Sequence, residues 1–115
     1  MKPEDLQNIA LDALNDLKAI DVVTYDVRGM TTISDTMIIC TGRSTRHVKS
    51  LAENVVTEAK AKKVDYIKFE GLREGEWVIV DLADVVVHIM IPSARDFYNL
   101  EDLWEPIKEL REHSR

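Results

Sequence analysis

Cysteine, proline, glycine and aromatic residues are all scarce in this chain of 115 residues. Its single cysteine, Cys40, cannot form an internal disulfide, which excludes a small fold held together by disulfide bonds. With three prolines and four glycines there is no linker or low-complexity tract that would divide the chain. No apolar run approaches the ~20 residues of a membrane helix, and the early acidic residues Glu4 and Asp5 are unlike a secretory signal. We therefore predict a single domain in the cytoplasm.

Positive charge is also in short supply, because the formal net charge is −6. Nucleic-acid binding without sequence preference needs lysine and arginine to displace counterions from phosphates, so this chain is a poor candidate for general RNA or DNA binding. A basic protein is the better partner. One local basic stretch, residues 42–49, opens a predicted helix and carries Arg43, Arg46 and Lys49. Contact of these side chains with an anion is one hypothesis, and a solvated helix start is the other.

The periodicity of the apolar residues predicts three helices and five strands. The expected helices cover about 3–19 and 44–63, and a third follows a cap at Asn99; the expected strands cover 22–28, 36–41, 65–70, 76–82 and 85–91. Because hairpins are mixed with helical crossovers in this order, we expect an α/β fold with one mixed sheet and packed helices. We predict one domain over 1–115, with a core of about 6–104 and a C-terminal extension over 105–115.

The last two strands predict a hairpin with two different sides. If Ala83 and Asp84 form its turn, one side is entirely aliphatic. The other side pairs Trp77 with Met90, Ile79 with His88, and Asp81 with Val86. A large aromatic ring, a thioether, an imidazole and a carboxylate together are typical of the centre of a protein interface. The alternative is a second core face that the final helix covers.

Catalytic chemistry is hard to assemble from these residues. The three histidines and Cys40 show none of the spacings of metal ligands, and Cys40 lies in an apolar strand where an inert thiol is the default. Ser44 precedes a helix and is better placed to cap it than to act as a nucleophile. Asp81 and Asp84 resemble the carboxylates of a nucleotidyltransferase, but a spacing of three sends them to opposite sides of a strand. We therefore predict neither an enzyme nor a cofactor or metal.

Three blocks of the sequence, in the same order, resemble the ribosomal silencing factors, which are also called Iojap-related proteins. The first block is Ser34–Val48, with an acidic residue, an apolar strand, C-T-G and an S-x-R-x-V helix start. The second is Trp77–His88, similar to W-x-x-x-D-x-x-D-V-x-V-H, with Glu70-Gly71 ahead of it. The third is Arg95–Trp104, similar to R-x-x-Y-x-L-E-x-L-W. The resemblance therefore covers most of the chain, from about residue 6 to residue 104.

The resemblance implies a mixed-sheet α/β fold of nucleotidyltransferase-like topology without the catalytic site. It also implies binding to ribosomal protein L-fourteen of the large ribosomal subunit, which blocks subunit joining and represses translation in stationary phase or starvation. A large-subunit assembly factor that uses the same surface is the alternative, a nucleotidyltransferase-like enzyme is a distant one, and the family also forms homodimers. The residues that we expect to bind the ribosomal protein are Trp77, Asp81, Asp84, His88, Met90, Arg95, Tyr98 and Glu101.

Overall fold

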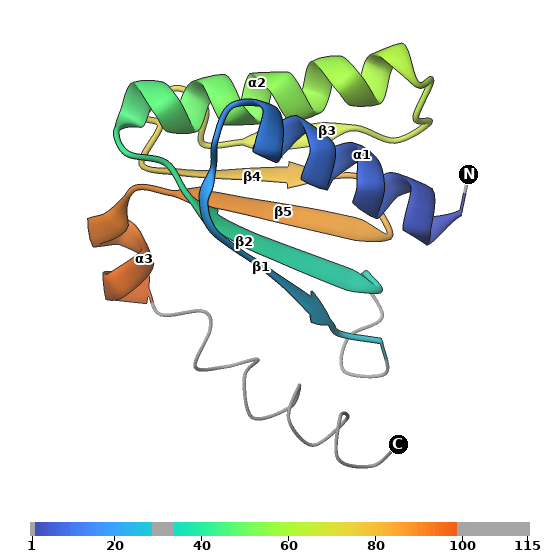
Figure 1. Ribbon diagram of the computed structural model, residues 1–115, viewed down its shortest axis with the longest axis horizontal. Coiled ribbons are helices and arrows are strands. Elements are labelled where there is room, and N and C mark those ends of the chain that lie inside the picture. The colour runs from blue at the N-terminus through green and yellow to red at the C-terminus, as the bar shows by residue number, and fades with distance from the viewer. Residues whose placement is uncertain (1, 29–33, 99–115) are drawn as a thin grey trace.

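A computed structural model describes residues 2–28 and 34–98 of the chain, and these residues form a sheet with two helices on one face and a short helix at one end (Figure 1). None of the described helices combines the length and apolarity that a bilayer crossing requires. In chain order the elements are α1 (Pro3–Asp16), β1 (Ile20–Asp26), β2 (Thr36–Thr41), α2 (Thr45–Ala61), β3 (Lys68–Glu70), β4 (Trp77–Asp81), β5 (Val85–Met90) and α3 (Pro92–Tyr98).

The five strands form one mixed sheet in the order β1-β2-β5-β4-β3. Only β2 and β5 run parallel, and the other three neighbouring pairs are antiparallel. The parallel pair arises because α2 and the β3–β4 hairpin lie between β2 and β5 in the sequence, which is long enough for a crossover. The predicted α/β fold with a five-stranded mixed sheet is confirmed.

The main core lies between the sheet and the pair α1 and α2. Each helix directs one apolar stripe at the sheet, and the aliphatic side chains of β4 and β5 meet these stripes: Val78, Val80, Val85, Val87 and Ile89, all fully buried. A side-chain hydrogen bond also joins the two helices, because the amide of Asn54 donates to the carbonyl oxygen of Ala13 at 2.8 Å. Removal of this apolar area from water is the main force that holds both helices on this face.

The β4–β5 hairpin has the predicted register, with Trp77 opposite Met90 and Ile79 opposite His88. Ala83 occupies the turn with φ of 70°, a backbone conformation that alanine rarely adopts. The side chain of Asp81 offsets this strain, because its carboxylate accepts a hydrogen bond from the Ala83 N–H at 2.8 Å. Ala83 and Asp84, a dipeptide that is not favoured in turns, therefore close the hairpin because Asp81 of β4 holds the Ala83 N–H.

Several predicted element ends differ from the structure by one or two residues, and three differences are larger. The first helix ends at Asp16 rather than near residue 19, because Lys18 has φ of 59° and cannot continue the helix. The strand expected over 65–70 is limited to Lys68–Glu70. The short helix α3, which begins at Pro92, has no counterpart among the predicted elements, although proline is favoured at the first helical position. The helix expected after Asn99 lies outside the described residues.

Candidate binding surface

The sheet face opposite α1 and α2, here called the outer face, carries all the polar side chains that the hairpin pattern predicted on one side. Its members follow from strand register: Val23 and Tyr25 from β1; Met37, Ile39 and Thr41 from β2; Val86, His88 and Met90 from β5; Trp77, Ile79 and Asp81 from β4; Lys68 and Glu70 from β3. This face divides into a buried half and an open half.

The buried half lies over β1, β2 and the end of β5. Tyr25, Ile39 and Met90 form a second core cluster there with Ala94 of α3. Met90 has no exposed area, so the expectation that it contacts a partner is wrong. Its thioether instead fills space between the sheet and α3, which is a common use of methionine. This half is therefore a second core face covered in part by α3, whereas the final helix that was expected to cover it lies outside the described residues.

The open half lies over β4 and β3. Trp77, Ile79 and Asp81 are half-buried, while Lys68 and Glu70 are exposed. A shallow hollow of about 110 Å³ is lined by Ile79, Asp81, Lys68 and Glu70, together with Phe69. Sequence reasoning placed Ile79 on this side but did not include it in the site, and it missed Lys68 and Glu70. The position of Ile79 opposite His88 in the hairpin indicated its face. The face of Lys68 and Glu70 depends on how β3 pairs with β4, which the local sequence does not reveal.

Trp77 and His88 form a hydrogen-bonded pair at the boundary between the two halves. The indole Nε1–H donates to Nδ1 of His88 at 3.0 Å, and the ring centroids lie 5.8 Å apart. Because Nδ1 accepts this bond, a neutral His88 carries its proton on Nε2. Burial lowers the pKa of His88 from 6.5 to about 4, so the imidazole is neutral at physiological pH. The pair therefore fixes the orientation of the tryptophan ring.

Acidification is expected to reduce the free energy of unfolding by about 3 kcal/mol through His88 alone. The folded pKa lies below the unfolded one, so between about pH 6.5 and about pH 4 the unfolded chain binds more protons. The contribution is complete above this window and is lost as the pH falls through it. Urea denaturation of the wild type and of His88→Asn, whose amide oxygen replaces the Nδ1 acceptor, measures the effect. Equal pH slopes in the two proteins would contradict it.

The two predicted aspartates have structural partners in the turn region. Asp81 accepts the Ala83 N–H through its carboxylate, and the carbonyl oxygen of Asp84 accepts the N–H groups of Asp35 and Thr36 at 2.9 and 3.0 Å. Both side chains are half-buried, so a fraction of each carboxylate remains available to a partner. Their contact with a ribosomal protein stays a prediction.

Arg95 anchors α3 to the edge of the sheet. Its Nη1 donates to the carbonyl oxygen of Asp21 and to Oγ1 of Thr41, both at 2.8 Å. These bonds join α3 to β1 and β2, so Arg95 has an internal role in addition to the contact predicted for it. Tyr98 ends α3, but its side chain and the whole of Glu101 lie outside the described residues.

The basic stretch at the start of α2 is arranged by a capping network. Ser44 caps the helix as predicted, because its hydroxyl accepts the His47 N–H at 3.1 Å. The ring of His47 accepts the Arg43 N–H at Nδ1 and bonds through Nε2 to the carbonyl oxygen of Leu17, which fixes the end of α1. Arg43 and Arg46 are exposed and Lys49 is half-buried. Their contact with an anion remains a prediction.

Reactive groups are buried or engaged in the described part of the chain. Cys40 is fully buried, and burial raises the pKa of its thiol to about 12, so it stays protonated and weakly nucleophilic. The hydroxyl of Ser44 is used for capping. Among the described residues, no group of three or more His, Cys, Asp or Glu side chains is placed to hold a metal ion.

Comparison with known proteins gives consistent matches along the chain. The model of the family described as ribosomal silencing factor during starvation matches residues 1–115. A Haemophilus influenzae protein named ribosomal silencing factor RsfS is 43% identical over 99 residues, covering 86% of this chain and 97% of that protein. A crystal structure from Chromobacterium violaceum is similar with a TM-score of 0.88 at 42% identity, covering 91% of this chain and 88% of that one. A Mus musculus protein named mitochondrial assembly of ribosomal large subunit protein 1 is 30% identical over 100 residues, covering 84% of this chain and 44% of that protein.

Proposed function

The chain belongs to the ribosomal silencing factor family, and from this premise we propose that it binds the large ribosomal subunit through ribosomal protein L-fourteen. The bound protein prevents the small subunit from joining and so represses translation during starvation or stationary phase. The family is regulatory, and the proposed action requires no catalysis. It requires affinity for the joining face of one subunit and enough bulk to collide with the other, which a domain of 13.2 kDa provides.

The observation that supports this proposal is the open half of the outer face. Trp77 and Ile79 give it an apolar centre, Asp81 adds negative charge, and Glu70 and Lys68 form an ion pair at its rim. Interfaces commonly combine an aromatic anchor with a polar rim, and tryptophan is enriched among the residues that dominate binding energy. The net charge of −6 favours association with a basic ribosomal protein.

A subunit-joining assay tests the proposal. Adding the purified protein to separated mature subunits is expected to reduce the fraction of joined ribosomes in a sucrose gradient, because the bound protein occupies the joining face. A pull-down with isolated ribosomal protein L-fourteen locates the contact. Undiminished joining with large subunits that carry the bound protein would contradict the anti-association mechanism, and absence of binding would contradict the partner.

The relative from Mus musculus favours one second candidate, because its name describes assembly of the mitochondrial large subunit. An assembly factor would use the same surface on an immature particle. It would bind immature large subunits more tightly than mature ones and leave the joining of mature subunits unchanged. The same gradient, run with both kinds of particle, separates the two functions.

A further inference from the structure

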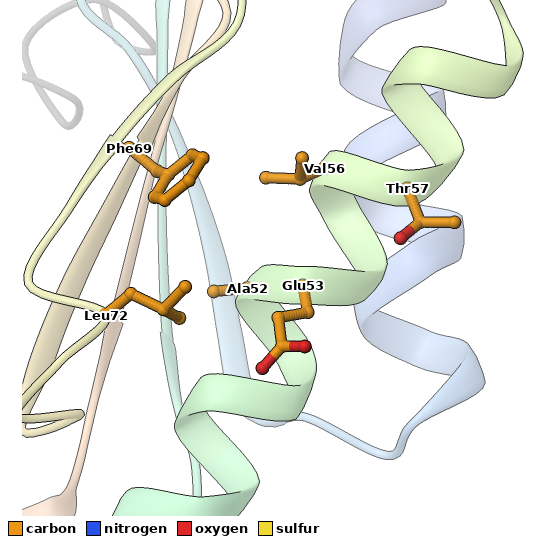
Figure 2. Close-up of a pocket in the computed structure, with 6 residues that line it drawn as sticks. All are labelled: Ala52, Glu53, Val56, Thr57, Phe69 and Leu72. Carbon is orange, nitrogen blue, oxygen red and sulfur yellow. The ribbon is translucent and has the colours of Figure 1, made fainter.

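A second apolar depression lies on the other side of strand β3, between this strand and helix α2 (Figure 2). It is here called the α2–β3 groove. Its lining residues are Ala52, Glu53, Val56 and Thr57 of α2, Phe69 of β3 and Leu72 of the following loop. In Figure 2 the ring of Phe69 and the side chain of Leu72 point toward Val56 and Ala52. The hollow measures about 130 Å³, and a dry apolar cavity of ~150 Å³ holds a benzene molecule, so one leucine-sized side chain fits.

The groove exists because β3 is the last strand of the sheet. Phe69 pairs with Val80, so its ring points to the same side as the main core, yet it remains 45% exposed. No further strand of the described chain lies beyond β3, and α2 forms the opposite wall of the groove from the ring. An edge strand also presents backbone N–H and C=O groups that another extended segment can pair with. The groove therefore combines a side-chain pocket with a free strand edge.

Charge at the groove favours one kind of occupant. Glu53 is exposed on its rim, and it forms no ion pair within the described residues, while no lysine or arginine lines the hollow. Glu70 extends from β3 toward the open half of the outer face, where it forms an ion pair with Lys68 at 3.9 Å, so the charge argument rests on Glu53. A second copy of this chain, also at −6, would bring net negative charge against Glu53. A basic segment would instead place a cation beside it.

We propose that the α2–β3 groove binds an extended basic segment of a protein of the large ribosomal subunit. The segment lies along the free edge of β3 and inserts one bulky aliphatic side chain between Phe69 and Val56. Because successive side chains of an added strand alternate between faces, its next residue reaches the outer face at Glu70. The groove thus continues the proposed ribosomal-protein interface around the edge of the sheet. The inference rests on the proposed function, which names the large ribosomal subunit as the binding partner.

Binding of purified large subunits to variants of the full chain tests the groove. Phe69→Ser removes one wall and is expected to lower affinity by about tenfold, as for truncation of an interface aromatic. Tyr66→Ser is the matched control, because Tyr66 is 48% exposed and close in sequence but does not line the groove. Glu53→Gln is expected to lower affinity by about threefold and to weaken its salt dependence, while Asp12→Asn on α1 leaves both unchanged.

Crosslinking identifies the occupant. A photoreactive phenylalanine analogue in place of Thr57, at the groove rim, is expected to crosslink to a basic segment of a large-subunit protein. Crosslinks to ribosomal RNA, to a second copy or within the chain would overturn the proposal, as would normal affinity of folded Phe69→Ser. Failure of the proposed function would give a different result from failure of the groove proposal, because the wild type would then not bind the large subunit at all. Circular dichroism confirms that each variant is folded.

Discussion

Trp77→Ala is expected to weaken binding to the large ribosomal subunit by about thirtyfold or more, which corresponds to about 2 kcal/mol. Trp77 is the largest apolar side chain on the open half of the outer face, and the hydrogen bond to His88 holds its ring in place. Truncation removes the anchor and leaves His88 without that donor. Sedimentation of the variant with purified large subunits measures the loss.

Two further variants serve as controls for the loss of binding by Trp77→Ala. Trp77→Phe keeps an aromatic ring but has no N–H for His88, so its affinity is expected to lie between those of the wild type and Trp77→Ala. Tyr66→Ala removes an exposed aromatic side chain that lies outside the described strands and is expected to bind normally. If folded Trp77→Ala binds the large subunit as the wild type does, the open half of the outer face is not the interface.

Gly71→Ala is expected to lower the free energy of unfolding by about 3 kcal/mol or more. Gly71 has φ of 86°, and a Cβ atom there would overlap the backbone carbonyl oxygen of Trp77. The carbonyl belongs to β4, so relief of the overlap requires the β3–β4 loop or the start of the strand to move. This variant therefore disturbs the position of Trp77 as well as stability, and urea denaturation followed by Trp fluorescence measures both.

Gly75 provides the matched control for Gly71. It also has positive φ, at 74°, but the nearest atom to its missing Cβ is the side-chain Cε of Lys49 at 2.8 Å, which can move away. The carbonyl oxygen of Thr45 lies next, at 2.9 Å. Gly75→Ala is expected to lose about 1 to 2 kcal/mol, from backbone strain at positive φ and from the close contact with the Thr45 carbonyl oxygen. Equal stability of Gly71→Ala and the wild type would show that the loop does not need this conformation.

The local sequence pattern was sufficient to predict the register of the β4–β5 hairpin. Its two sides alternate in the sequence, and a slip by one residue would turn the aliphatic set, including Val78 and Val87, away from the helices. The register, and with it the shared face of Trp77 and His88, therefore follows from the order of the amino acids. The role of Ser44 as the cap of α2 could also be predicted from local sequence, because a capping side chain bonds to a backbone N–H three residues further along the chain.

Exposure along the outer face could not be derived in this way. Met90 and Trp77 lie directly opposite each other and have the same alternation signal, yet one is fully buried and the other half-buried. Met90 belongs to the core cluster that includes Ala94 of α3, whereas Trp77 is only partly buried against that cluster. Where a short helix folds back depends on contacts between distant parts of the chain, such as that of Arg95 with Asp21.

Motif order and the periods of two and 3.6 residues were enough to predict the family, the mixed α/β sheet and the pairing of the hairpin that carries Trp77 and His88. Packing between distant elements was needed to place Met90 in the core, to add Lys68 and Glu70 to the open half, and to set Phe69 beside a groove. Strand order is the cause of this division. A side chain on an edge strand and one on a central strand have the same local pattern, but only the central one is covered by neighbours on both sides.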